Sequence, residues 1–176
     1  MTVEDLLYEE GHLLRDGAPD DYLERARHAC GEILPRDAME AIEAVDLGAY
    51  EDDLVEMIRE AKRRAGEDAR VRALYWEFDL DNDWNSAVDL CGEFDPEDDE
   101  WAAASLGWID GPSCPALTEL FERFGFAGSP EAVASTTLLV ARTFSTFRRA
   151  YDRAARSELP FGIAYHDGSV VMMPRA

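Results

Sequence analysis

The sequence predicts a single α+β domain over residues 1–176, with an antiparallel sheet of about five strands packed by helices. Apolar residues recur at helical spacing through residues 1–66, and apolar and polar residues alternate within residues 70–110. Further helices over residues 115–157 and a hairpin over residues 160–174 complete the pattern. No repeat or linker divides the chain, and its length suits one core.

Residues 1–66 are expected to form four helices. Each has a start or stop residue that favours a helix end. These are the capping residue Thr2, the prolines Pro19 and Pro35 at the entries of the second and third helices, and the glycines Gly48 and Gly66, expected to end the third and the fourth.

Residues 70–110 are expected to form a three-stranded meander. Trp76 and Phe78 would face the core from the first strand, while Tyr75 and Glu77 would face outward. The turn at residues 81–83 predicts a second strand over 85–92, and a third is expected over 101–109, where alanines also permit a short helix.

The rest of the chain predicts two helices and a closing hairpin. A helix is expected over residues 115–124, and Ser129 with Pro130 would start the longest helix, which runs to about Ser157. Two short strands then flank residues 166–168 (His-Asp-Gly), because Asp-Gly is a favoured tight-turn pair.

The chain carries 38 acidic and 17 basic residues, for a formal net charge of -21. A surface of this charge repels nucleic acid and anionic lipid, so neither is an expected partner, whereas basic proteins are. Genome composition or adaptation to salt would also produce such acidity, so a solubility-adapted structural domain without a dedicated partner is an alternative.

A cytoplasmic location is expected. The three cysteines are scattered, which predicts reduced thiols and no metal site. The N-terminus carries acids where a signal peptide carries positive charge, and no apolar run approaches the length of a membrane span. No phosphate-binding or dinucleotide motif is present, so no cofactor is expected.

Charge is most segregated in residues 73–122, which hold fourteen acids and no lysine or arginine. Interleaved aromatic residues could anchor a basic partner there. The residues expected to bind it are Tyr75, Glu77, Asp79, Asp81, Asp83, Trp84, Asp95, Asp98, Asp99, Glu100 and Trp101. The alternative is a solvated loop with its aromatics turned inward, neutralised by arginines of the long helix at 142, 149, 153 and 156.

Segments 75–79 (YWEFD), 91–94 (CGEF), 98–101 (DDEW) and 161–168 (FGIAYHDG) resemble small immunity proteins of bacterial polymorphic toxin systems and uncharacterised α+β domains found among them. The resemblance implies a non-enzymatic, acidic protein that binds and blocks a basic toxin or effector domain. No catalytic residue is carried over by it.

Catalysis is the remaining alternative and is less favoured than binding. Acid pairs near Glu77 and Asp79 could support metal-assisted hydrolysis, since both would share one strand face. The run from Asp79 to Asp83 fails as a calcium loop, because Trp84 stands at the position where that loop needs glycine. His166 is interpreted as a turn residue.

Overall fold

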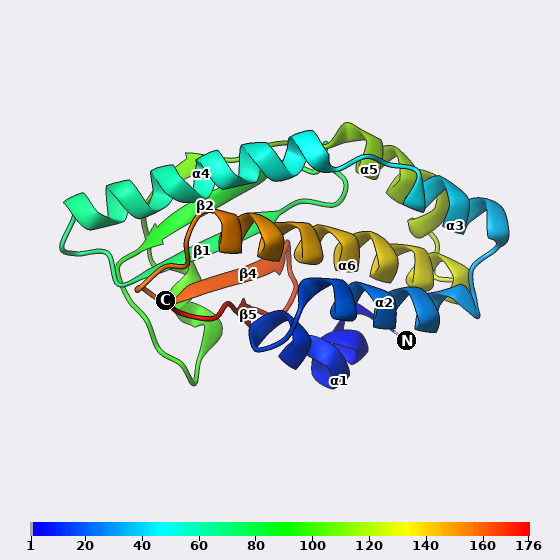
Figure 1. Ribbon diagram of the computed structural model, residues 1–176, viewed down its shortest axis with the longest axis horizontal. Coiled ribbons are helices and arrows are strands. Elements are labelled where there is room, and N and C mark those ends of the chain that lie inside the picture. The colour runs from blue at the N-terminus through cyan, green and yellow to red at the C-terminus, as the bar shows by residue number, and fades with distance from the viewer. Residues whose placement is uncertain (1) are drawn as a thin grey trace.

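A computed structural model describes residues 2–176 and confirms the α+β class (Figure 1). The helices are α1 (Val3–Arg15), α2 (Pro19–Gly31), α3 (Arg36–Glu43), α4 (Gly48–Glu67), α5 (Pro115–Leu120) and α6 (Pro130–Arg153). The strands are β1 (Ala73–Phe78), β2 (Ser86–Cys91), β3 (Ser105–Asp110), β4 (Phe161–Tyr165) and β5 (Val171–Met172). A short 3-10 helix, η1 (Asp99–Ala103), precedes β3, and a π-helical turn, η2 (Phe121–Gly125), follows α5.

The predicted helix starts are confirmed by their caps. The Asp5 backbone N–H donates to Thr2 Oγ1 at 3.1 Å, and the Thr2 N–H donates to Asp5 Oδ2 at 2.9 Å, which completes a reciprocal capping box. Ser129 caps α6 with a single bond, in which its side-chain oxygen accepts from the Ala132 N–H at 3.2 Å. These ends form locally because each side chain satisfies an amide that the first helical turn leaves free.

Both glycine stop signals are wrong. Gly48 is the first residue of α4, and Gly66 lies inside that helix. The Asp46 side chain accepts from the Gly48 N–H at 2.8 Å, so a local turn separates α3 from α4. The helix runs one residue past Gly66, which therefore lies in its last turn.

The five strands form one sheet in the order β3-β2-β1-β4-β5. The meander and the closing hairpin are antiparallel, as expected. The expectation of a wholly antiparallel sheet is wrong at one pair, because β4 runs parallel to β1, with Tyr75 opposite Gly162. The chain leaves the meander and crosses the sheet through α6, and such a crossover lets the next strand run parallel.

The third strand is shorter than predicted. It begins at Ser105, and Trp101 lies in η1 instead. Asp98 accepts from the Glu100 N–H at 3.0 Å and caps this short helix. Local side-chain capping therefore competes successfully with strand pairing before residue 105.

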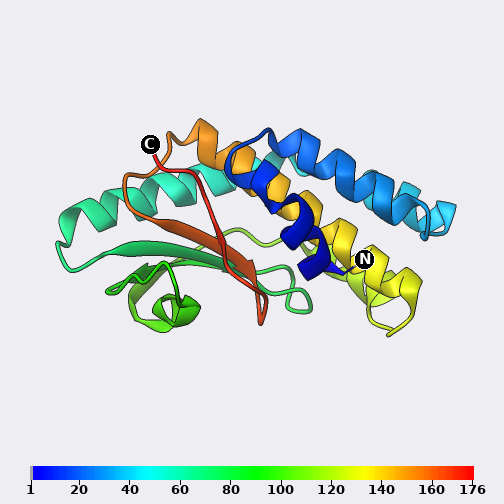
Figure 2. The same ribbon diagram turned by 90° about the horizontal axis from the view of Figure 1, so that it is seen from below.

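Helix α6 lies across the inner face of the sheet, and Figure 2 shows the helices on that side with η1 on the other. The core between them is aromatic. Trp76 stacks on Phe147 with ring centroids 4.3 Å apart, and Phe78 stacks on Trp84 at 5.3 Å. Among the helices of residues 2–176, none is both long and apolar enough for a membrane span.

A second, smaller core lies on the outer face. Trp101 from η1 meets Tyr75 edge-on at 6.1 Å and Phe94 at 5.3 Å, above the buried Cys91. Burial raises the pKa of the Cys91 thiol to about 12. This patch covers one end of the outer face and leaves the rest uncovered for a site.

Candidate protein-binding face

The uncovered part of the outer sheet face holds a cavity of about 420 Å³, here called the acidic pocket. Its polar lining consists of Tyr75, Glu77, Asp89, Asp99, Ser105, His166 and Asp167. Four of these side chains are carboxylates, and no arginine or lysine lines it.

Strand register brings these side chains together. Strand alternation turns Tyr75 and Glu77 outward on β1, and the pairing of β1 with β2 sets Asp89 opposite Tyr75. The parallel pairing of β4 with β1 brings the end of β4 beside Glu77, so His166 reaches it from the following turn.

The Glu77 carboxylate is the centre of the pocket's hydrogen bonds. The Tyr75 hydroxyl donates to its Oε2 at 2.7 Å, and His166 Nδ1 lies 2.9 Å from its Oε1. The hydrogen bond to Glu77, together with that carboxylate's charge, raises the pKa of His166 above its usual range. Burial and the bond to Glu77 raise the pKa of the Tyr75 hydroxyl.

Asp89 is a pocket carboxylate whose charged form is disfavoured by burial. It is half-buried on β2, and its Oδ1 accepts from the Ser105 hydroxyl at 2.6 Å. Desolvation by burial, with a smaller effect of the Glu77 charge, raises the pKa of Asp89. No cation of residues 2–176 pairs with it, so a cation supplied from outside would relieve this cost.

The three aromatic residues expected to anchor a partner lie inside the protein, which corrects that expectation. Trp84 is 0 % exposed, and its Nε1 donates to Thr143 Oγ1 at 3.0 Å. Trp101 and Tyr75 are also buried, packed against each other in the small outer core. The inward alternative for these aromatics is therefore the correct one.

The predicted acids lie in three places. Glu77 is in the acidic pocket, and Asp99 lines its rim, where its Oδ2 accepts from the Val170 N–H at 3.4 Å. Asp79, Asp81 and Asp83 belong to the β1–β2 turn. Asp95 and Asp98 are exposed in the loop before η1, and Glu100 is exposed in η1 itself. Burial and the neighbouring Asp81 raise the pKa of Asp79.

The residues that sequence reasoning missed lie on β2, β3 and the last turn. Trp108 is 64 % exposed and Leu106 44 % exposed, and Trp108 lies opposite Asp89 in the β2–β3 register. The alternation of β3 around the buried Ile109 could have placed Trp108 outward. The contact between His166 and Glu77 had no sequence signal, because it depends on the parallel pairing of β4.

Charge is partitioned between the two sides of the molecule. Every arginine–carboxylate ion pair in residues 2–176 lies outside residues 73–122. Arg149 and Arg153 of α6 both bind Glu51 of α4, at 3.0 and 2.8 Å. Arg156 pairs with Asp152, and Arg142 donates to the carbonyl oxygens of α3 and the turn after it.

The arginines of α6 therefore neutralise helical carboxylates rather than the acidic strands, and the alternative of internal neutralisation is wrong. Attraction between unlike charges is strongest at short range, and α6 lies on the face of the sheet opposite η1, whose Ala102 and Ala103 line the pocket. The acids of the strands and of the loops between them form no ion pair with these arginines.

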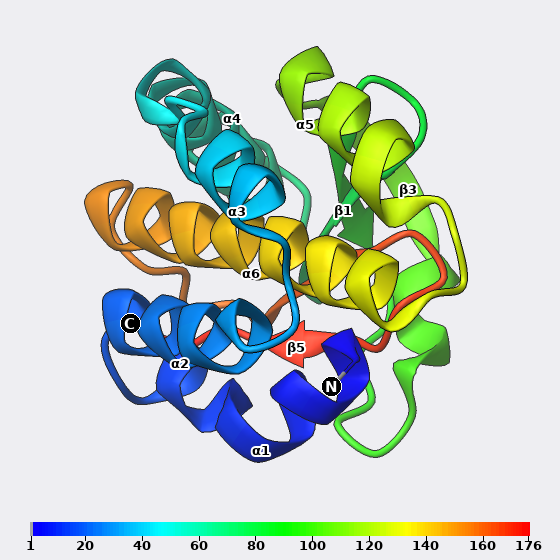
Figure 3. The ribbon, with the colours of Figure 1, turned by 90° about the vertical axis from the view of Figure 1, so that its right-hand side faces the viewer.

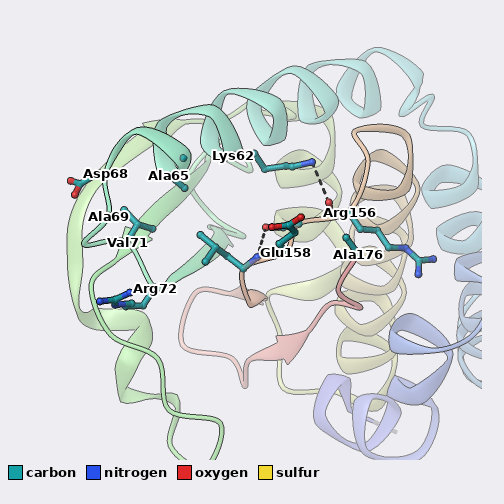
Figure 4. Close-up of a pocket in the computed structure, with 12 residues that line it drawn as sticks. Lys62, Ala65, Asp68, Ala69, Val71, Arg72, Arg156, Glu158 and Ala176 are labelled. Carbon is teal, nitrogen blue, oxygen red and sulfur yellow. Dashed lines mark hydrogen bonds between the residues drawn. The ribbon is translucent and has the colours of Figure 1, made fainter.

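A second cavity, of about 590 Å³, lies near the end of α4 (Figure 4). Lys62, the only lysine, reaches from α4 to the end of α6, where its Nζ donates to the carbonyl oxygens of Ala154 and Arg156 at 3.3 and 3.2 Å. Its charge completes the carbonyl end of α6, where a helix dipole favours a cation. This lysine is thus a structural cap.

Glu77 and Asp79, the acids considered for hydrolysis, do not bond to each other. Glu77 bonds to Tyr75 and His166, whereas Asp79 interacts with Asp81. In the described part of the chain, no three histidine, cysteine or acidic side chains are grouped closely enough to hold a metal ion.

Replacing Asp89 with asparagine is expected to stabilise the protein at neutral pH by about 0.5 kcal/mol. The raised pKa means that the folded state binds a proton more tightly than the unfolded state, so the charged carboxylate costs stability above its unfolded pKa of 3.8. The gain should be smaller at pH 5 than at pH 7, as measured by urea unfolding. Asp110→Asn, at an exposed position, is the control. If Asp89→Asn stabilised the protein no more than Asp110→Asn, or destabilised it, the charged form of Asp89 would not lower the stability.

No family model, curated protein or solved structure matches the chain.

Proposed function

We propose that this protein is a binding module for a basic protein, and that the outer sheet face around the acidic pocket is its docking surface. The observation that carries the proposal is the partition of charge. The carboxylates of residues 73–122 have no arginine or lysine partner within residues 2–176. The carboxylates of the helices, by contrast, form many ion pairs with arginines. A field of one sign on one face steers an oppositely charged partner.

Trp108 is the aromatic anchor of this surface. Its side chain is 64 % exposed and lies beside Asp89, in the setting where interfaces concentrate binding energy. A partner's arginine can stack on the indole while its charge meets Asp89 and Glu77. The arrangement joins apolar contact area with charge complementarity.

An immunity-type inhibitor is the form of this function that the acidic face and the resemblance to toxin-immunity proteins together support best. In that role the protein would occupy the active cleft of a basic toxin or effector domain in the cytoplasm. Its carboxylates would meet the arginines and lysines with which that domain binds its own substrate. Inhibition would follow from occlusion and would require no chemistry by this chain.

Capture tests the proposal against adaptation to salt. The immobilised protein is incubated with lysate of its source cells at about 0.05 M salt and eluted to about 0.5 M, which shortens the screening length severalfold. We expect one basic protein in stoichiometric amount, whose own activity falls when the purified pair is recombined. A protein that retains no partner and gains stability in concentrated salt would be a solubility-adapted domain, and the proposal would be wrong.

A further inference from the structure

Strand β3 forms one edge of the sheet, and its outer side is unpaired within residues 2–176. The Gly111 N–H donates to the Ser86 carbonyl at 2.8 Å, so Ser86 and Gly111 form a hydrogen-bonded pair of the β2–β3 ladder. Because such pairs alternate along an antiparallel ladder, Val88 and Ile109 form the next one. The N–H and C=O groups of Trp108 and Asp110 therefore point away from β2, toward the free side.

The opposite edge is shielded. Strand β5 has only two residues and lies beside α1 (Figure 3), and the Tyr165 hydroxyl of the neighbouring β4 donates to Glu4 of that helix. Proteins protect free edges with short strands, coverings, lysines or prolines. Strand β3 has no lysine or proline, and it carries the exposed Leu106 and Trp108, so this edge is the one open to pairing.

Both sides of the β3 edge suit basic side chains. On the outer side lie Trp108 and Asp89. On the helical side, a cavity of about 390 Å³ is lined by Met57 and Ile109 together with carboxylates of α4. Those carboxylates are Asp53, Glu56 and Glu60. Successive side chains of a strand alternate between faces, so an added strand would present residues to both sides in turn.

We infer that the partner contributes an extended basic segment, which pairs with the free edge of β3 as a sixth strand. Main-chain hydrogen bonds to Trp108 and Asp110 provide register, and basic side chains at alternate positions enter the acidic surroundings of the outer face, beside Trp108 and Asp89. A second copy of this chain is a poor occupant, because two chains that each carry a net charge of -21 would repel each other. The inference rests on the proposed function and specifies how the partner is held.

The test uses Asp110→Pro and its matched control Asp110→Ala. Both remove the carboxylate, but only proline removes the N–H that faces the free edge, and edge strands tolerate proline there. The probe is a fluorescent peptide of about six residues alternating arginine and valine, the length of a typical strand. We expect Asp110→Ala to bind it within a few-fold of the wild type and Asp110→Pro to lose about 10-fold.

Binding of N-methylated peptides to the wild-type protein is a second test, which does not depend on the folding of the proline variant. Two peptides are methylated on alternate residues, so that only one set of N–H groups can face β3. Loss of binding by one and retention by the other support strand addition. Equal binding of both, with Asp110→Pro equal to Asp110→Ala, would overturn the inference and leave surface attraction intact.

Two further outcomes are separable. Failure of every peptide to bind at low salt would count against the proposed function itself. A wild-type dimer in sedimentation equilibrium that Asp110→Pro dissociates would assign the edge to a second copy and overturn the basic segment as its occupant.

Discussion

Trp84→Ala is expected to lower the free energy of unfolding by about 3–5 kcal/mol. The indole is 0 % exposed, stacks on Phe78 at 5.3 Å and donates to Thr143 of α6 at 3.0 Å. Its removal leaves a cavity between the sheet and α6 and an unmet bond at the Thr143 hydroxyl. Urea unfolding followed by far-ultraviolet circular dichroism measures the loss.

Trp84→Phe separates the two contributions. Phenylalanine keeps most of the ring contact but cannot donate to Thr143, whose hydroxyl still donates to the Leu139 carbonyl at 2.9 Å. We expect a loss of about 1–2 kcal/mol for this variant. If Trp84→Ala cost less than about 1 kcal/mol, as a surface substitution does, the burial of this residue would be contradicted.

The triple variant Glu77→Gln, Asp89→Asn, Asp110→Asn is expected to weaken binding of the captured basic partner about 100-fold at low salt. The three carboxylates lie on the outer face and at its β3 edge, and none pairs with an arginine or lysine in the described chain. Their removal takes away two of the four carboxylates of the acidic pocket and the one on β3. Titration calorimetry with the purified partner gives the affinity, and stopped-flow mixing shows the expected fall in association rate.

A matched triple variant removes the same net charge from the helical side. Glu9→Gln, Asp21→Asn and Glu32→Gln alter exposed acids that form no ion pair within residues 2–176. We expect a change in affinity of less than about 3-fold for this control, because α1 and α2 lie on the side of the sheet away from η1 and the docking surface, and salt screens exposed charges that are far apart. Equal losses in both triple variants would mean that net charge alone drives association, and the outer face would lose its assignment.

Local features of the fold were predictable because their causes are local. The capping residues Thr2 and Ser129 each satisfy an amide three residues away, so the starts of α1 and α6 follow from short segments. The alternation in β1 and the Asp-Gly turn before β5 are decided at the same range. The acidic character of residues 73–122 is likewise a property of composition.

Of the residues expected to bind a partner, Glu77 and Asp99 line the acidic pocket, whereas Trp84 and Trp101 are buried. Trp108, which the sequence did not single out, is exposed. Strand alternation identifies two faces but does not say which aromatic residue a cap such as η1 will cover. That choice depends on the packing of η1 onto β1, over a separation of more than twenty residues.

By itself the sequence determined the α+β class, the starts of α1 and α6, the two hairpins and the concentration of acids in residues 73–122, since each depends on neighbours along the chain. Tertiary structure alone decided that β4 runs parallel to β1, that His166 contacts Glu77, and that arginines of α6 form ion pairs with carboxylates of other helices. These contacts join residues about ninety positions apart, and their partners are selected by the packing of α6 across the sheet. Long-range pairing of this kind is set by the energy of the whole core, which no short segment contains.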